Sequence, residues 1–450
     1  MQTEHSSRNL TLTDCRVQRR INKFNVRKLI LINVTILISL GAGSCGGVVQ
    51  EADSRDGCAL ALAPHTGSLA IDREIIRLQE TAGTATDRAR VLEQLGWGYV
   101  RKARISYDLG FYKLAEQCAI CIESHHPDSP EALLLRGHVL QNLHRFKDAE
   151  SIARRLAETR AAPFDYALLG DSLMEQGRLN QAVEAYQKMI DLKPGPQAYT
   201  RVAHIRWLKG DLEGAIEMMR KAAAAMSPRD HESSAWAYTR LALYELQAGS
   251  PENAERACEA ALRLQNDYAP ALLARSRVLL SQNRNTEAAA LMQQAATLNP
   301  LPENKWILAD ALRAAGRIDA ARAVEDELKQ RGASEDPRTL ALFLATRREQ
   351  PDTALKLVAE ELNARADVFT FDAFAWALAA AGRLNESGEY MKKALAEGTK
   401  DARLYYHAGS IASMSGQKPE ARLLLNKAVK MKQMLLPSER EGLSRTLAEL

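Results

Sequence analysis

The sequence is poor in aromatic residues, and its composition is not that of a β-sheet protein. Its 450 residues include only 8 Phe, 12 Tyr and 5 Trp, whereas Ala and Leu are abundant and the 25 Gly and 15 Pro are scattered along the chain. Such a composition is typical of helical hairpins. A chain of this length holds either several domains or one array in which each unit buries its apolar face against its neighbours. We therefore expect an all-α protein.

The sequence also lacks an excess of basic residues once its first 44 residues are set aside. The whole chain carries 60 Lys and Arg against 56 Asp and Glu, and residues 1–44 hold seven of the basic and two of the acidic residues, which leaves 53 against 54. A nucleic-acid-binding surface needs a sustained basic stripe that displaces condensed counterions, and no such stripe follows residue 45. We therefore expect no nucleic acid among the partners.

No apolar run is long enough to cross a bilayer. The longest, Leu29–Leu40, has about 12 residues, against the ~20 that a membrane-spanning helix needs. It follows a basic stretch and precedes the small residues 41–44, an order typical of a signal peptide. Residues 1–44 are therefore predicted to be an export signal, and residues 45–70, which mix Gly, Ala, Ser and Asp without periodicity, a flexible tether.

Cys45 follows two small residues and resembles the lipobox cysteine of bacterial lipoproteins, which is acylated and becomes the new N-terminus. This resemblance implies a lipid anchor at Cys45. Gly46 follows it instead of aspartate, so resemblance to Gram-negative lipoproteins implies an outer-membrane protein that faces the periplasm. Two alternatives stay open: ordinary signal cleavage after residues 42–44, which yields a secreted protein with a free Cys45 thiol, and an uncleaved anchor in the inner membrane.

A pattern of two small residues, twelve positions apart with a turn between them, recurs about every 34 residues over residues 86–432. It resembles the tetratricopeptide repeat (TPR), in which these residues, at repeat positions 8 and 20, lie where two helices cross. The resemblance implies a superhelical solenoid of about ten helix-turn-helix repeats over residues 71–436. Ser438 and Glu441 form a capping-box pattern that predicts a C-terminal capping helix over residues 437–450. The ten pairs are Ala103/Ala115, Gly137/Ala149, Gly170/Ala182, Ala203/Ala215, Ala242/Ala254, Ser276/Ala288, Ala309/Ala321, Leu342/Ala354, Ala375/Ser387 and Gly409/Ala421.

The repeats contain no motif that carries catalysis: neither a Gly-rich phosphate loop nor a His-Glu-x-x-His sequence occurs. We expect no enzyme and no cofactor. Cys118 and Cys121, followed by His125, form the one metal-like cluster, but no second Cys-x-x-Cys completes a structural zinc site, so we interpret the cysteines as packing residues and expect no metal. Because a solenoid of this size needs no disulfides, Cys58, Cys118, Cys121 and Cys258 are expected to be free or incidentally paired thiols.

TPR arrays like this one present repeat positions 5, 9, 12 and 13 of their first helices along a concave groove, so the resemblance implies a set of contact residues there. Aromatic residues and arginine dominate binding hot spots, which favours this set, although packing between repeats is the alternative. We expect alanine at Trp306 and Arg313 to abolish partner capture without unfolding the array. The candidates are His138, Asp171, His204, Trp207, Arg277, Trp306, Asp310, Arg313, Trp376 and Tyr406.

These patterns together predict a non-catalytic scaffold that is tethered to a membrane and binds other proteins in its groove. No unit carries the lysine and asparagine pair with which chaperone-binding TPR domains hold a C-terminal carboxylate. The alternative function is an assembly factor for envelope polysaccharide or for secretion, which binds glycan or a translocating substrate in the same groove.

Overall fold

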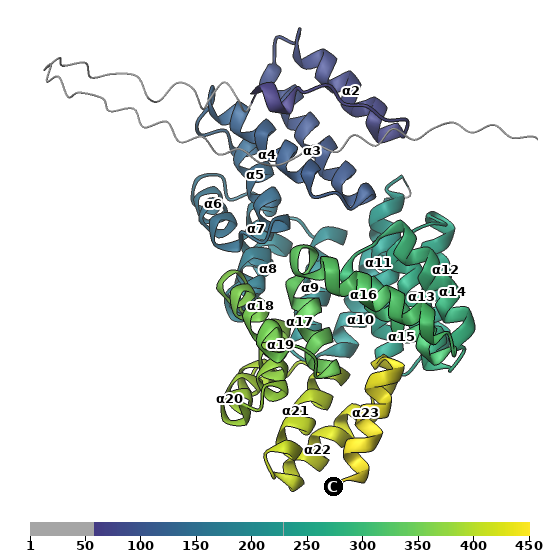
Figure 1. The fold of residues 1–450 in the computed structure, drawn as a ribbon. Coiled ribbons are helices and arrows are strands. Elements are labelled where there is room, and N and C mark those ends of the chain that lie inside the picture. The colour runs from purple at the N-terminus through teal and green to yellow at the C-terminus, as the bar shows by residue number, and fades with distance from the viewer. Residues whose placement is uncertain (1–57, 228) are drawn as a thin grey trace, which may run out of the picture. The chain divides into compact units, whose positions relative to one another are not determined.

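The computed structural model describes residues 58–227 and 229–450, and this part of the chain is built from α-helices, with no strand and one short 3-10 helix (Figure 1). Helix α2 (Ala70–Ala82) precedes ten consecutive antiparallel hairpins, and η1 (Lys432–Met434) and α23 (Pro437–Ala448) follow them. The predicted all-α solenoid of ten repeats is therefore confirmed. Hairpins 1–10 are α3 (Arg88–Ser106) with α4 (Gly110–Glu123), α5 (Pro130–Asn142) with α6 (Phe146–Thr159), α7 (Pro163–Glu175) with α8 (Leu179–Leu192), α9 (Pro196–Leu208) with α10 (Leu212–Ala225), α11 (His231–Gln247) with α12 (Pro251–Leu264), α13 (Ala269–Ser281) with α14 (Asn285–Leu298), α15 (Pro302–Ala314) with α16 (Ile318–Glu335), α17 (Pro337–Arg347) with α18 (Pro351–Ala364), α19 (Val368–Ala380) with α20 (Leu384–Leu395), and α21 (Ala402–Met414) with α22 (Lys418–Val429).

The small residues at repeat positions 8 and 20 lie where the two helices of each hairpin cross. Every position-20 residue has an exposed fraction of 0%. A methyl group on Gly170 would overlap the ring of Tyr186, so glycine is required for the close approach of α7 and α8. Where serine replaces glycine or alanine, its hydroxyl crosses to the partner helix: Ser276 Oγ donates to Ala288 O at 2.9 Å. The repeat register inferred from the sequence is confirmed in all ten hairpins.

The turns within most hairpins end in a residue with left-handed backbone geometry. Gly177, Gly210, Gly249 and Gly316 have φ between 74° and 80°, a region that glycine enters without steric cost. Four of the second helices also start with a favourable N-terminus: α12, α18 and α22 have proline in the first turn, and in α10 Asp211 Oδ1 accepts a hydrogen bond from Gly214 N at 2.9 Å. The sequence therefore encodes each hairpin locally.

Residues 58–69 belong to the folded part, so the predicted start of folded structure at residue 71 is wrong. Residues 58–61 form one helical turn, Ala61 is buried, and Tyr99 Oη donates a hydrogen bond to Ala61 O at 3.0 Å. A disulfide joins Cys58 to Cys121 of α4. This bond holds a segment whose composition alone suggested a tether. The predicted signal peptide and Cys45 lie outside the described residues.

The C-terminal helix α23 begins at Pro437, as predicted, but the predicted capping box does not form, and a single side-chain contact closes its first turn. Glu439 Oε2 accepts a hydrogen bond from Leu436 N at 2.8 Å, whereas the predicted pair was Ser438 and Glu441. Leu443 is buried, and Leu447 packs against the same apolar cluster. Among the helices of the described part, none combines the length and the apolar character needed to cross a membrane.

The array coils so that its later hairpins pack against its earlier ones. Thr399 Oγ1 donates to Leu208 O, Lys209 Nζ lies 3.0 Å from Glu397 Oε2, and Arg365 Nη2 lies 2.8 Å from Glu175 Oε2. Each of these contacts joins hairpin 3 or 4 to a residue 188 to 191 positions later in the chain. We call this set of contacts the seam.

Candidate functional site on the inner face

We call inner face the side of the first helices that carries repeat positions 5, 9, 12 and 13, together with positions 2 and 6, which lie on the same side of the helix. In hairpins 1 and 2 it is formed by Trp97, Arg104 and His138. The His138 ring lies 5.2 Å from the Trp97 ring, and Arg104 Nη2 is 3.2 Å from His138 Nε2. Burial, together with the charge of Arg104, lowers the pKa of His138 to about 3, so its imidazole is neutral at physiological pH.

Asp171 of α7 lies on the inner face but is neutralised by the chain itself. Its carboxylate accepts from Arg201 Nη2 at 2.7 Å and Arg201 Nε at 2.8 Å, a two-point contact that suits the planar guanidinium. Tyr186 Oη also donates to Asp171 Oδ1 at 2.8 Å. This carboxylate has its partners already, so its first role is to join α7 to α9.

His204 and Trp207 lie together on α9 in an aromatic and cationic cluster. Their rings stack at 5.4 Å, and the Arg240 guanidinium lies 5.9 Å from the Trp207 ring centre. Trp207 also stacks on Phe369 of α19 at 5.7 Å, across the seam. Burial, followed by the charge of Arg240, lowers the pKa of His204 to about 3. Both predicted residues are half-buried, and part of the Trp207 surface serves packing.

Met431–Arg440, which we call the C-terminal segment, covers the inner face of hairpins 6 and 7 and the C-terminal end of α11 in hairpin 5. Gln433 Nε2 donates to Gln247 O at 3.0 Å, and Arg440 Nη2 donates to Leu280 O at 2.7 Å. The predicted contact residue Arg277 donates to Met434 O at 3.4 Å. This part of the predicted groove is therefore occupied by the protein's own chain.

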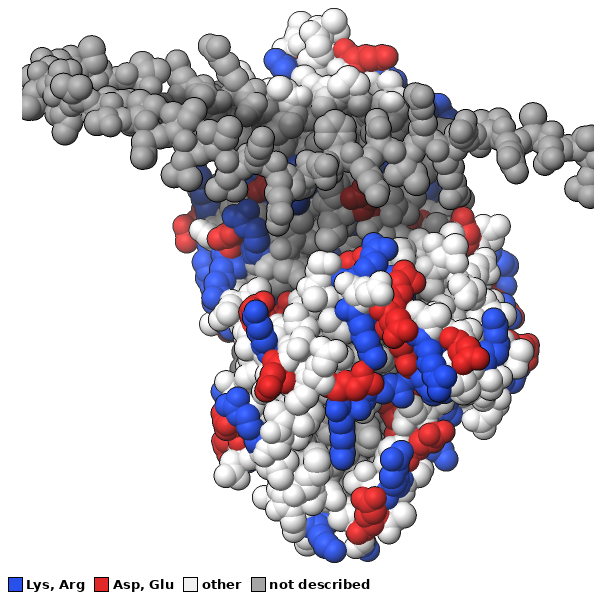
Figure 2. Space-filling model, in the orientation of Figure 1, with Lys and Arg blue, Asp and Glu red and all other residues white. Residues whose placement is uncertain are grey.

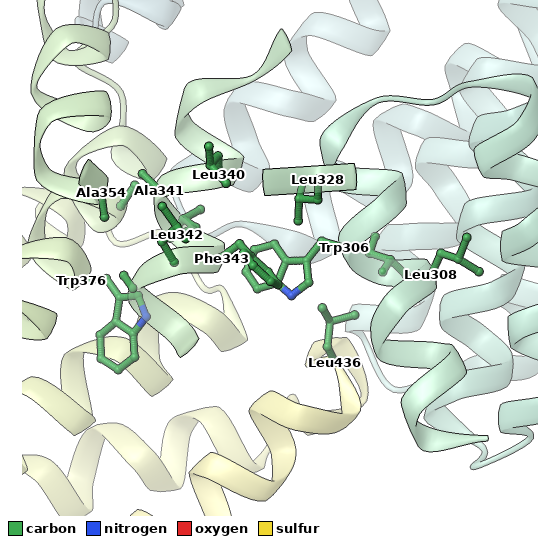
Figure 3. Close-up of a cluster of buried hydrophobic side chains, with 14 of the residues drawn as sticks. Trp306, Leu308, Leu328, Leu340, Ala341, Leu342, Phe343, Ala354, Trp376 and Leu436 are labelled. Atoms are coloured by element: carbon green, nitrogen blue, oxygen red, sulfur yellow. The ribbon is translucent and has the colours of Figure 1, made fainter. Parts of the chain in front are cut away.

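Trp306 and Asp310, both predicted contact residues, are buried beneath this segment. Trp306 is 2% exposed; its ring meets Phe343 edge-on at 5.9 Å, and Figure 3 shows Leu436 beside them. Asp310 Oδ2 accepts from Ser438 N at 3.1 Å, and burial raises the pKa of Asp310 to about 6. The expectation that Trp306→Ala would leave the array intact is therefore wrong, because removing a buried tryptophan costs about 3–5 kcal/mol.

The remaining predicted residues also serve packing in hairpins 7–10. Arg313 pairs with Glu325 of its own hairpin at 2.8 Å. Trp376 stacks on His407 at 4.2 Å and is 8% exposed, and Tyr406, 7% exposed, lies 5.9 Å from the Trp376 ring. Of the ten predicted residues, Arg277 and Asp310 bond to the C-terminal segment, Trp306, Trp376 and Tyr406 are buried, and His138, Asp171, His204, Trp207 and Arg313 are partly exposed.

Trp236 and Arg240 of α11 were not among the predicted residues. Trp236 is 38% exposed, an unusual state for a tryptophan in a helical array. The two residues are four positions apart and thus lie on one face of α11, the face from which Arg240 contacts His204. They occupy repeat positions 2 and 6, outside the four positions considered, but their four-residue spacing is a signal that the sequence contains.

A cavity of about 190 Å³ lies at the seam between hairpins 3–4 and 8–9. Its lining includes His204 and Phe369 and two acidic and two basic side chains, which pair with each other: Arg365 with Glu175 at 2.8 Å and Arg338 with Asp367 at 3.2 Å. Because these charges neutralise one another within the chain, the cavity presents no unsatisfied charge to a ligand.

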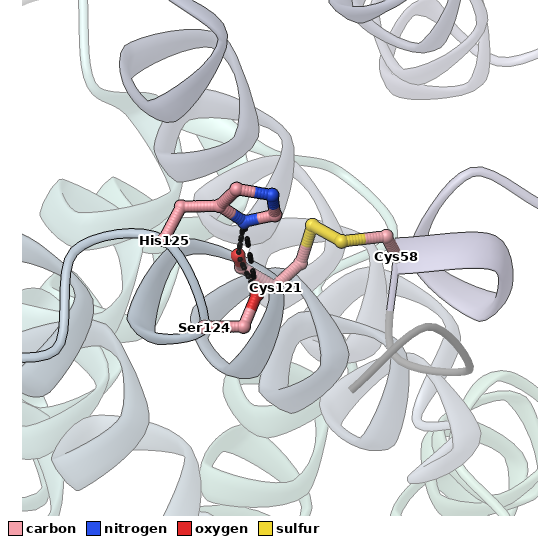
Figure 4. The surroundings of a disulfide bond; sticks show 4 residues. All are labelled: Cys58, Cys121, Ser124 and His125. Atoms are coloured by element: carbon pink, nitrogen blue, oxygen red, sulfur yellow. Dashed lines mark hydrogen bonds between the residues drawn. A yellow bond between two sulfur atoms is a disulfide. The ribbon is translucent and has the colours of Figure 1, made fainter. Parts of the chain in front are cut away.

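The Cys118–Cys121 cluster is not arranged as a metal site in the part of the chain that the structure describes. Cys121 is bonded to Cys58, a pairing that the expectation of free or incidentally paired thiols left open, and the bond leaves Cys121 without a thiolate (Figure 4). Burial raises the pKa of the Cys118 thiol, and His125 Nδ1 contacts Cys121 O at 3.1 Å. Within residues 58–227 and 229–450, no three His, Cys, Asp or Glu side chains converge as metal ligands would. Cys258 is buried and free.

The surface charge of the described part is mixed in sign. Figure 2 shows acidic and basic side chains interspersed on the face that it draws. Many of them form short ion pairs along one helix, as Arg383 and Glu386 do at 2.6 Å. Exposed pairs of this kind contribute little to stability and mainly keep the surface soluble.

Comparison with known proteins identifies the repeat. A model of the tetratricopeptide repeat matches residues 168–231, 239–303 and 273–337. Such repeats generally mediate protein–protein interactions and act as non-catalytic scaffolds. No curated protein sequence matches the chain.

Several solved structures share the helical-repeat fold. They include Pseudomonas aeruginosa PilF (16% identity, 46% of this chain and 93% of that chain, TM-score 0.38) and yeast Tom70 (15%, 84% and 96%, TM-score 0.36). Human IFIT1 in a dimer with PPP-AAAA is similar over 86% of this chain and 96% of that chain, at 12% identity and a TM-score of 0.46. At these identities and TM-scores, the likeness concerns the fold alone and transfers no ligand.

Proposed function

We propose that this protein is an exported, non-catalytic scaffold that binds partner proteins on the inner face of hairpins 1–5. The observation that carries the proposal is the division of the inner face. The C-terminal segment covers hairpins 6 and 7 and the end of α11, whereas Trp236 in the first turns of α11 is 38% exposed and Arg104 of α3 lies at the surface. Exposed tryptophan and arginine are the residue types that anchor protein interfaces.

Export through the predicted signal peptide is supported by the disulfide between Cys58 and Cys121. Disulfides persist in oxidising compartments such as the periplasm and are rare in the cytosol. We propose that the exported chain is anchored by an acylated Cys45 in the outer membrane, facing the periplasm. A palmitate analogue should label wild-type cells and not cells with Cys45→Ala; label on both or on neither leaves a secreted protein or an inner-membrane anchor.

We propose a polypeptide as the partner and not a nucleic acid. Binding to a phosphate backbone requires many cationic contacts, each of which releases counterions. On the inner face most arginines are already paired with carboxylates, as Arg201 is with Asp171 and Arg403 with Glu439. An aromatic surface with few free cations suits a peptide segment that buries apolar side chains.

The experiment that tests this function is crosslinking in the native cell envelope, followed by mass spectrometry of the recovered material. Trp236→Ala should reduce recovery of a discrete polypeptide at least tenfold. Leu423→Ala is the matched control, because Leu423 is 60% exposed on the second helix α22 and lies outside the inner face. Equal recovery with both variants would contradict the proposed surface. Carbohydrate recovered in place of a polypeptide would favour the alternative role in polysaccharide or secretion assembly.

A further inference from the structure

The repeated architecture allows equivalent positions to be compared within one chain, and this comparison singles out Arg240. Three first helices carry arginine at repeat position 6, two residues before the crossing position. Arg101 of α3 pairs with Glu74 of α2 at 2.6 Å. Arg201 of α9 pairs with Asp171 of α7 at 2.7 Å. In both cases an earlier helix on the inner side, α2 or the first helix of the preceding hairpin, supplies a carboxylate that neutralises the guanidinium.

Arg240 of α11 lacks this carboxylate. The residue of α9 that corresponds to Asp171 is His204, because each follows the crossing residue of its helix directly. Arg240 Nη2 lies 3.4 Å from His204 Nδ1 and 3.5 Å from Tyr244 Oη, both long contacts with neutral groups. Among the described residues, no acidic oxygen lies within 4.0 Å of the Arg240 guanidinium. Half-buried charges are normally paired, so this arrangement leaves one anionic group missing.

The surroundings of Arg240 hold the guanidinium in place without satisfying it. Its planar group lies over the rings of Tyr244, at 5.3 Å, and Trp207, at 5.9 Å. Trp207 is fixed in turn by a hydrogen bond from Nε1 to Gln247 Oε1 at 2.8 Å. A guanidinium that is fixed on aromatic rings loses little conformational entropy when it binds a carboxylate. Trp236, one helical turn away, adds an exposed apolar surface.

We propose that Arg240 binds a carboxylate of an acidic partner segment, with an apolar side chain of the same segment against Trp236. The partner's Asp or Glu takes the place that Asp171 occupies one repeat earlier. This inference rests on the proposed protein-binding function and adds the chemistry of the partner. A peptide fits the site better than a nucleic acid, because Arg240 can bind a single anionic group, whereas a phosphate backbone needs a row of cationic side chains.

His204→Asp tests the proposal, since it supplies the internal carboxylate that hairpin 3 already has. The variant should fold, because Asp171 and Arg201 show that the same pair fits the repeat. It should nevertheless bind acidic peptides more weakly, since the new carboxylate at position 204 then neutralises Arg240. Arg240→Gln should bind them more weakly too and provides a second test should His204→Asp fail to fold. Gln294→Glu is the matched control: it adds the same charge at an exposed position of α14, the second helix of hairpin 6.

The measurement is selection of random displayed peptides on the full chain, purified in detergent, followed by titration of the selected peptides. The wild type and Gln294→Glu should enrich Asp and Glu beside an apolar residue, and His204→Asp and Arg240→Gln should weaken these peptides at least about tenfold. His204→Asn removes the ring without adding charge. If it weakens binding as much as His204→Asp does, loss of the ring explains the effect and the proposal is overturned.

The outcomes separate this inference from the proposed function. Enriched peptides without an acidic preference, or acidic peptides that bind His204→Asp unchanged, would overturn the role of Arg240 and leave the scaffold function standing. If no peptide is enriched on any variant, both fail. An oligoribonucleotide of similar length serves as the competing probe. If it binds more tightly than the selected peptides and depends on Arg240, the partner is a nucleic acid and the proposal is wrong.

Discussion

Gly210→Ala tests whether the array closes on itself along the seam. Gly210 ends the turn of hairpin 4 with φ of 79°, and a methyl group on it would overlap Gly398 O. Gly316 ends the turn of hairpin 7 with φ of 78°, but nothing lies within 4 Å of the position that its methyl group would take. Both substitutions therefore impose the same backbone strain, and only one of them imposes a clash.

The expected magnitudes follow from this difference. Alanine in the left-handed region costs about 1–2 kcal/mol in either variant. At Gly210 the backbone at Gly398 must also move, and overpacking of this kind costs a further ~1–3 kcal/mol. The movement would strain the hydrogen bond from Thr399 Oγ1 to Leu208 O and the ion pair of Lys209 with Glu397.

Urea unfolding measures the total loss of stability in each variant, and hydrogen exchange shows which part of the chain is destabilised. Backbone amides of residues 397–400 should exchange faster in Gly210→Ala than in Gly316→Ala, since local opening of the seam exposes them. Gly177→Ala provides a second case, because its methyl group would overlap Ala366 O. Equal destabilisation by the Gly210 and Gly316 variants, with unchanged exchange at residues 397–400, would refute the closed arrangement.

Three further predictions follow from buried or covalently linked groups. Cys58→Ser should lower the free energy of unfolding by up to about 4 kcal/mol, because the disulfide closes a loop with a sequence separation of 63. Dithiothreitol should destabilise the wild type to the same extent and leave the variant unchanged. A wild type that dithiothreitol does not destabilise would contradict this prediction. Asp310→Asn should stabilise the protein by up to about 3 kcal/mol at pH 8 and little at pH 4. Burial raises the pKa of Asp310 from 3.8 to about 6, so the folded wild type loses stability as this buried carboxyl ionises with rising pH. Equal shifts of the urea midpoint at both pH values would count against this prediction. The pKa values of His138 and His204 are lowered from 6.5 to about 3, so these residues contribute stability that is complete above pH 6.5 and is lost as the pH falls towards 3. Replacing both with Asn should therefore make the melting temperature decline less between pH 7 and pH 4.5.

The hairpins could be predicted from the sequence because their determinants are local. Two helices that cross closely leave room for Gly, Ala or Ser only, and the turn that joins them favours residues that adopt positive φ. Even the unit around Leu342, which lacks a small residue at position 8, forms a hairpin, because Ala354 keeps the second helix close and Arg348 and Gln350 supply the positive φ values. The periodic pattern therefore fixed the register without any knowledge of distant contacts.

The exposure of the inner face could not be predicted to the same extent, because it depends on contacts with the distant C-terminal segment. Trp306, Asp310 and Arg277 stand at positions where repeats bind ligands, but the C-terminal segment reaches them from more than 120 positions away. The pitch of the superhelix decides whether such a segment meets them, and pitch accumulates from small rotations at every hairpin. The partner of Cys121 is likewise distant, at Cys58, so spacing within α4 could not reveal it.

The C-terminal segment also limits which part of the inner face a partner can contact. While the C-terminal segment is seated, it blocks access to the inner face of hairpins 6 and 7, whereas the first turns of α11 keep Trp236 exposed and Arg240 without a carboxylate. The same segment supplies Glu439 to Arg403 at 2.6 Å, so in the second half of the array the chain provides the acidic group itself. In the second half, this carboxylate binds an arginine that lies beside an aromatic ring, since Arg403 lies 4.9 Å from the Trp306 ring, and Arg240 lies beside Trp207 and Tyr244 in the same way. What the C-terminal segment does for Arg403 within the chain is what we infer an acidic partner does for Arg240.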